Sequence, residues 1–82
     1  MVGPDAIISQ HALSRMLRKG IRLTDVEMVL SLGEHVEGRR PGIREACAEL
    51  DGRPITIVYD AGEYLAKDVY RIVAVLRRRC SD

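Results

Sequence analysis

Tryptophan and phenylalanine are absent from this sequence, and its three aromatic residues are all tyrosines. The chain therefore lacks an aromatic platform on which nucleic-acid bases could stack, and its core has to be aliphatic. No apolar run approaches the ~20 residues of a membrane-spanning helix. The first residues also lack the basic and then apolar pattern of a secretion signal. We therefore expect a cytoplasmic protein with no membrane partner.

Cysteine is scarce, with Cys47 and Cys80 as the two examples. Two cysteines are too few for a disulfide framework, so we expect Cys47 to be a small buried residue and Cys80 an exposed thiol. His11 and His35 have no cysteine pair nearby and form no His-Glu-x-x-His pattern. Because metal sites depend on such ligand spacings, the sequence predicts neither a metal nor another cofactor.

An excess of one charge is missing too, because 13 Lys and Arg face 12 Asp and Glu, for a formal net charge of +1. Bulk electrostatics therefore indicates no partner, and a nucleic-acid site would need local clustering. With 46% hydrophobic and 30% charged residues among 82, the chain is typical of one globular domain. We expect that domain over 1–82, with an ordered core over about 6–76. A flexible N-terminus and a basic tail, Arg77 to Arg79, would flank it. The tail is interpreted as solubilising, with phosphate contact as the alternative.

Two short helices are predicted in the first half of the chain. Ser9 is a suitable N-cap and Gly20 a suitable end for a helix over 9–20. Thr24 with Glu27 three residues later forms a capping-box pattern for a second helix, which Gly33 ends.

The second half has the pattern of β-strands. Residues 43–50 have both helical and alternating spacing, but Asp51-Gly52 is a strong hairpin signal and 55–59 beyond it is a clear β run. We therefore expect strands over 43–50, 55–59 and 68–76, with a link over 61–67, an edge strand over 35–37 and a short strand over 6–8. The predicted class is α+β, with two N-terminal helices on a three- to four-stranded antiparallel sheet.

The first helix carries a basic face. At 100° per residue, its cationic side chains project within about a quarter-turn of one another: His11, Arg15, Arg18, Lys19 and Arg22. An apolar stripe lies on the opposite side and is expected to be buried: Ala12, Leu13, Met16 and Leu17. Such a face is either solvated or a site for phosphate.

Metal-independent RNA cleavage needs an acid, a base and cations that stabilise the phosphorane. The imidazole of His11 can act as acid or base, while Arg15, one turn further, can hold a phosphate through its fork. These two are the candidate catalytic residues. The candidate phosphate-binding residues extend the same positive surface or enter from the sheet: Arg18, Lys19, Arg22, Arg44 and Arg71.

Residues 11–16 read H-A-L-S-R-M and residues 19–21 read K-G-I. This resembles the motif H-A-x-x-R-M-x-x-R-G-I of a family of small bacterial and archaeal domains of unknown function, over roughly residues 6–76. Lys19 stands where the motif has its second arginine. That family is similar in element order to the RelE-like ribonuclease toxins. The resemblance implies a helix pair on a twisted sheet, an RNA-cleaving face with His11 and Arg15, RNA or the ribosome as target, and a cognate antitoxin as partner.

Three functional interpretations stay open. The first is a RelE-like RNA endonuclease, and the second is a non-catalytic module that binds protein or nucleic acid on the same scaffold. The near-zero charge and the missing second acid–base group favour the second. In the third, His11 and Arg15 are structural and tie the helix start to the sheet.

Overall fold

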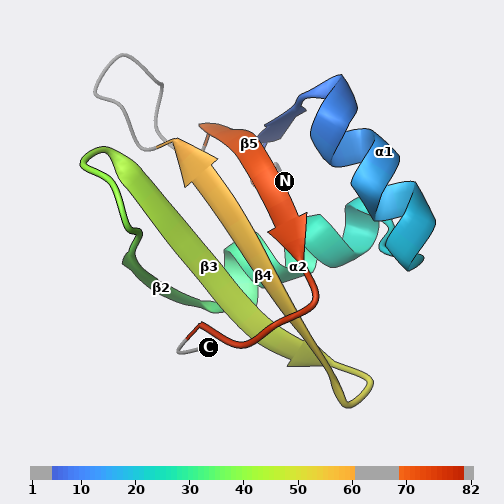
Figure 1. Cartoon of the computed structure of the whole chain (residues 1–82). Coiled ribbons are helices and arrows are strands. Elements are labelled where there is room, and N and C mark those ends of the chain that lie inside the picture. The colour runs from blue at the N-terminus through green and yellow to red at the C-terminus, as the bar shows by residue number, and fades with distance from the viewer. Residues whose placement is uncertain (1–4, 61–68, 81–82) are drawn as a thin grey trace.

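The computed structural model describes residues 5–60 and 69–80. The predicted link over 61–67 and residues 1–4 of the N-terminus lie outside this described part. The elements, shown in Figure 1, are β1 (Asp5–Ile8), α1 (Gln10–Lys19), α2 (Leu23–Leu32), β2 (Glu34–Glu37), β3 (Ile43–Leu50), β4 (Arg53–Asp60) and β5 (Val69–Leu76).

Helix α1 begins and ends where the sequence predicts. The backbone N–H of Ala12 donates to Ser9 Oγ at 3.1 Å, which satisfies one of the free amides of the first turn. At the other end Gly20 adopts a left-handed conformation, with φ 67°, which glycine reaches without a steric penalty.

The orientation of α1 about its axis differs from the prediction. Ala12 and Met16 are fully buried, but Leu13 is 45% and Leu17 74% exposed. The prediction that both leucines are buried is therefore wrong. Helix α1 packs on β5, and the ammonium group of Lys19 donates to the carbonyl of Val75 at 3.3 Å. Helix α1 buries only the two apolar residues Ala12 and Met16 because it packs near one edge of the sheet, on β5, which lies next to the edge strand β1.

Helix α2 begins earlier than predicted. Its N-cap is Arg22, and the backbone N–H of Arg22 donates to the Asp25 carboxylate at 2.9 Å. Asp25 therefore closes the first turn, and the prediction of a Thr24–Glu27 capping box is wrong. The helix buries Val26, Val29 and Leu30 against the sheet.

The sheet has five strands in the order β1-β5-β4-β3-β2. The pairs β2–β3, β3–β4 and β4–β5 are antiparallel, whereas β1 is parallel to β5. The predicted three to four antiparallel strands are therefore corrected to a mixed five-stranded sheet. The predicted hairpin is confirmed, since Asp51 and Gly52 both have positive φ, 54° and 76°, as a type I′ turn requires.

The two helices cover one face of the sheet (Figure 1), and the hydrophobic core lies between the helices and this face. Cross-strand partners point to the same face, so Ala46 and Ile57, which pair in register and are fully buried, mark the face beneath the helices. Glu45 and Val58 form the next pair and belong to the other face, which we call the open face.

The C-terminal segment crosses the open face instead of extending into solvent (Figure 1). The Thr56 hydroxyl donates to the carbonyl of Arg78, and the Arg78 guanidinium lies 3.2 Å from the Glu45 carboxylate. Cys80 forms a disulfide with Cys47. The interpretation of the arginine tail as solubilising is therefore wrong, and so is the expectation of two free thiols. The two cysteines are 33 residues apart, and no local pattern in the sequence indicates that they pair.

Candidate functional site

Three of the predicted cationic residues stand exposed on α1. His11, Arg15 and Arg18 are exposed, and within the described part of the chain they make no side-chain hydrogen bond or ion pair. Their positions one turn apart leave them available to an anionic ligand. The structure therefore keeps the predicted basic face at these positions.

Lys19 and Arg22 are engaged in the fold. Lys19 is held by the Val75 carbonyl. Arg22 forms an ion pair with Asp25, with Nη2 and Oδ1 3.4 Å apart. Its own side chain is 77% exposed, so it can turn to a ligand at little cost.

The two sheet arginines that the sequence predicts for the site, Arg44 and Arg71, do not join the α1 face. Arg71 pairs in register with Asp60, its guanidinium lies 3.9 Å from that carboxylate, and both residues belong to the open face. Arg44 lies on β3, which β4 separates from β5, the strand on which α1 packs. Neither of these two predicted arginines therefore joins His11 and Arg15 to complete a catalytic set.

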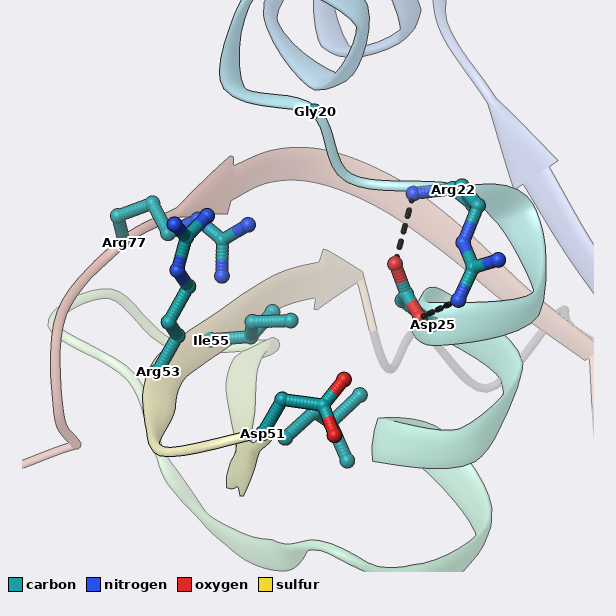
Figure 2. Close-up of a pocket in the computed structure, with 8 residues that line it drawn as sticks. Gly20, Arg22, Asp25, Asp51, Arg53, Ile55 and Arg77 are labelled. Atoms are coloured by element: carbon teal, nitrogen blue, oxygen red, sulfur yellow. Dashed lines mark hydrogen bonds and ion pairs between the residues drawn. The ribbon is translucent and has the colours of Figure 1, made fainter.

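A different group of basic residues surrounds a cavity of about 440 Å³ (Figure 2). This cavity lies where the α1–α2 connection, the β3–β4 turn and the end of β5 meet. We call it the arginine cavity, and its lining residues are Gly20, Arg22, Asp25, Leu50, Asp51, Arg53, Ile55 and Arg77.

Arg53 and Arg77 make the arginine cavity positively charged. Arg53 follows the Asp51-Gly52 turn and Arg77 follows β5, and both line the cavity. In Figure 2 the two side chains are drawn in the same part of the cavity, while the Asp51 carboxylate points away from both. Arg77 Nη2 donates to the carbonyl of Lys19 at 3.3 Å. Arg53 makes no hydrogen bond or ion pair with another described residue. Two like charges in one cavity favour an anion between them.

Asp25, one of the two acids that line the cavity, forms an ion pair with Arg22. The backbone N–H of Arg22, donating to Asp25, lowers the pKa of this carboxyl below its ordinary value of 3.8, and burial opposes that shift. The guanidinium groups of Arg22 and Arg77 lower the pKa further. Asp25 is therefore ionised and offsets part of the positive charge of Arg22 and Arg77. Asp51 is the one other acid among the lining residues, and its carboxylate points away from Arg53 and Arg77 (Figure 2).

Of the predicted phosphate-binding residues, Arg22 lines the arginine cavity and the others do not. Neither Arg53 nor Arg77 is among the residues that the sequence predicts for the site. The pattern favours a solubilising tail for Arg77, with phosphate contact as the alternative, and Arg53 follows a turn signal and has no basic neighbour in the sequence. A helix-based pattern cannot find them, because the fold brings them together from a hairpin and a strand end.

Apart from the arginine cavity, α1 borders an apolar groove of about 410 Å³. Its lining includes the exposed leucines Leu13, Leu17 and Leu23. No helix in the described part of the chain is long and apolar enough to cross a membrane.

Comparison with known proteins identifies the domain family. No curated protein and no solved structure matches the chain significantly. A family model described as a domain of unknown function, DUF4258, matches residues 8–78. This match covers α1 to the end of β5 and reaches Arg77 in the arginine cavity. The chain therefore belongs to the DUF4258 family.

Proposed function

We propose that this protein is an RNA-binding module that holds a backbone phosphate in the arginine cavity. The observation that carries the proposal is the pair Arg53 and Arg77, whose guanidinium groups extend into one cavity. A guanidinium fork matches a phosphate with two parallel N–H···O bonds. Two such forks, with Arg22 at the rim, suit the charge and the geometry of a phosphodiester.

The exposed basic residues of α1 lie on the helix that leads to the cavity. Gly20 in the lining directly follows α1, and Arg18, Arg15 and His11 are exposed along this helix. At 1.5 Å per residue the ten residues of α1 span about 15 Å. A single strand seated in the cavity can therefore follow the helix past these three side chains.

The nearly neutral charge of the chain sets the expected strength of binding. A net charge of +1 provides little long-range attraction for a polyanion, so affinity depends on the local contacts. Each phosphate contact with single-stranded RNA steepens the salt dependence of log K by about 0.7. We expect modest affinity with the salt slope of a few contacts.

A RelE-like RNA endonuclease is the second candidate. The observation in its favour is that His11 and Arg15 stand one turn apart on α1, both exposed, so that a general acid or base and a phosphate-binding cation can reach the same phosphodiester. Its weakness is that the predicted sheet arginines do not join this face, because Arg71 lies on the open face and Arg44 on β3. Binding is therefore proposed ahead of cleavage.

The test is binding of a fluorescently labelled single-stranded RNA, measured by anisotropy at several salt concentrations. Arg53→Gln and Arg77→Gln are each expected to weaken binding roughly tenfold, because a hydrogen bond to a charged group contributes about 1.5–3 kcal/mol. Each variant should also lower the salt slope by about 0.7.

Arg39→Gln is the matched control. It removes the same charge from the connection between β2 and β3, at the end of the sheet away from the cavity (Figure 1). The control should bind as the wild type does. Equal losses in all three variants would mean that binding follows net charge alone, and unchanged binding in Arg53→Gln would exclude the cavity.

A further inference from the structure

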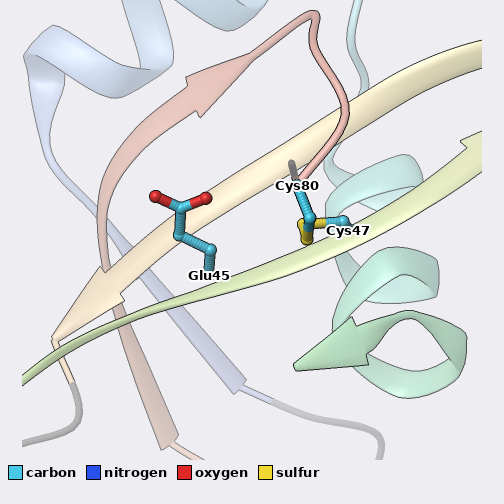
Figure 3. Close-up of side chains that lie close together, drawn as sticks. All are labelled: Glu45, Cys47 and Cys80. Atoms are coloured by element: carbon cyan, nitrogen blue, oxygen red, sulfur yellow. A yellow bond between two sulfur atoms is a disulfide. The ribbon is translucent and has the colours of Figure 1, made fainter. Parts of the chain in front are cut away.

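Two sulfurs and a buried carboxylate gather on the open face of the sheet (Figure 3). Cys47 and Cys80 are joined by a disulfide, with their Cα atoms 5.6 Å apart. Glu45 precedes Cys47 by two residues on the same face of β3, and its residue is 6% exposed. A carboxylate oxygen of Glu45 and the two Sγ atoms all lie within 4.8 Å of one another.

We propose that the chain with this disulfide reduced binds a zinc ion through Cys47, Cys80 and Glu45. Zinc takes thiolate sulfur and carboxylate oxygen at about 2.0–2.3 Å in tetrahedral geometry. Ligand atoms of such a site are therefore separated by less than about 4 Å, which small side-chain rotations reach from the observed cluster. The two sulfurs already face each other, so the backbone needs no rearrangement.

Zinc binding first requires reduction of the disulfide, for which a dithiol is the reductant. The dithiol gives two electrons and two protons to the disulfide, whose S–S bond breaks into two thiols while the dithiol becomes a disulfide. Each thiol then releases its proton to solvent when its sulfur donates an electron pair to Zn²⁺. Two protons leave for each ion bound, and no redox change occurs at the metal.

Arg78 completes the charge balance of this site. Two thiolates and one carboxylate around Zn²⁺ carry a net charge of −1, and the Arg78 guanidinium lies 3.2 Å from Glu45 Oε2. An outer cation that holds one carboxylate oxygen orients the other towards the metal. The contact that fixes the tail in the oxidised chain thus also suits the loaded site.

A cavity of about 280 Å³ gives the site an entrance. It is lined by both cysteines together with Glu34 and Glu49. Glu34 is the cross-strand partner of Cys47 in the register of β2 and β3. Both cysteines therefore border a solvent-accessible cavity through which an ion can enter.

The test uses the full chain, reduced with a dithiol that is then removed by gel filtration without oxygen, freed of metal with a chelator and titrated with Co²⁺ as a spectroscopic probe. The reduced protein should bind one ion per chain with the visible absorption and thiolate charge-transfer bands of tetrahedral cobalt, and Zn²⁺ should displace it. Glu45→Gln should weaken binding about tenfold or more. The oxidised protein should show neither band.

Glu49→Gln is the matched control, since Glu49 lies on the same face of β3 and its carboxylate is held by Arg79 at 3.9 Å. It should bind cobalt as the wild type does. The proposal is overturned if reduced wild type binds no better than the Cys47→Ser/Cys80→Ser variant, or if Glu45→Gln and Glu49→Gln behave alike. The proposal is also overturned if treatment of the native chain with the reductant does not produce two free thiols per chain.

Discussion

The imidazole Nδ1 of His35 lies 2.7 Å from the hydroxyl of Tyr59, and its Nε2 lies 2.9 Å from the carbonyl of Leu30. A carbonyl can only accept, so Nε2 carries the proton and Nδ1 accepts from Tyr59. His35 therefore connects the last turns of α2 with the central strand β4. This histidine is half-buried and joins α2 to the sheet, whereas His11 is exposed on α1.

Tyr59→Phe is expected to lower the free energy of unfolding by about 1–3 kcal/mol, because it leaves a half-buried acceptor of His35 without its donor. Urea denaturation measures the loss. A double-mutant cycle with His35→Ala isolates the contact, and we expect the two losses to be clearly less than additive. Additive losses would show that the hydrogen bond makes no energetic contribution.

Met16→Ala and Leu17→Ala form a pair that tests the orientation of α1. Met16 is 1% and Leu17 74% exposed, so the first change should cost about 2–5 kcal/mol and the second within about 0.5 kcal/mol. Thermal or urea unfolding of the two variants provides the comparison. Similar losses at both positions would indicate the orientation that the apolar stripe predicts.

The local signals of the sequence account for most of the elements. The Ser9 cap, the Gly20 end and the Asp51-Gly52 turn each depend on a backbone conformation that one or two residues determine, and all three are confirmed. Such features are predictable because the cause and the consequence lie within a few residues.

What could not be predicted depends on contacts between distant segments. The parallel pairing of β1 with β5, the disulfide of Cys47 and Cys80 and the arginine cavity each join parts of the chain that no local pattern relates. Helical periodicity likewise locates an apolar stripe but does not say how much of the stripe the sheet covers. For this reason the exposure of Leu17 could not be predicted. Of the candidate site, the exposed face with His11 and Arg15 was predictable, and Arg53 and Arg77 were not.

Asp25→Asn is expected to remove an acid-sensitive part of the stability. The pKa of Asp25 is lower in the folded chain than its ordinary value of 3.8 because its carboxylate accepts from the Arg22 N–H. The folded state therefore binds fewer protons, so the contribution is complete above pH 3.8 and is lost as the pH falls through the folded pKa. We expect a loss of about 1 kcal/mol at neutral pH.

Unfolding curves of wild type and Asp25→Asn, measured from neutral pH to well below 3.8, check this dependence. The two proteins should converge in stability as the pH falls. A constant difference across the whole range would show that the carboxylate charge is not the cause.

Cys80→Ser should lower the stability of the oxidised protein. A cross-link over 33 residues restricts the unfolded chain and is worth roughly 4 kcal/mol by loop entropy. Urea denaturation in the presence of a chelator measures the difference, and reduced wild type under the same conditions should resemble the variant. A variant as stable as oxidised wild type would show that the Thr56 and Glu45 contacts of Arg78 alone hold the C-terminal segment.

His11→Ala and Arg15→Ala separate the functional and the structural interpretations of α1. Both side chains are exposed, so each change should leave the free energy of unfolding within about 0.5 kcal/mol. If the protein cleaves RNA through this face, both variants should lose metal-independent turnover of a labelled single-stranded substrate by about 10²-fold or more while RNA affinity at the arginine cavity stays within a few-fold. If the protein binds RNA without cleaving it, wild type will show no turnover and Arg15→Ala will weaken binding less than Arg53→Gln does. Severe destabilisation of either variant would instead place His11 and Arg15 in the structural role, since an exposed pair with no described partner cannot otherwise carry the fold.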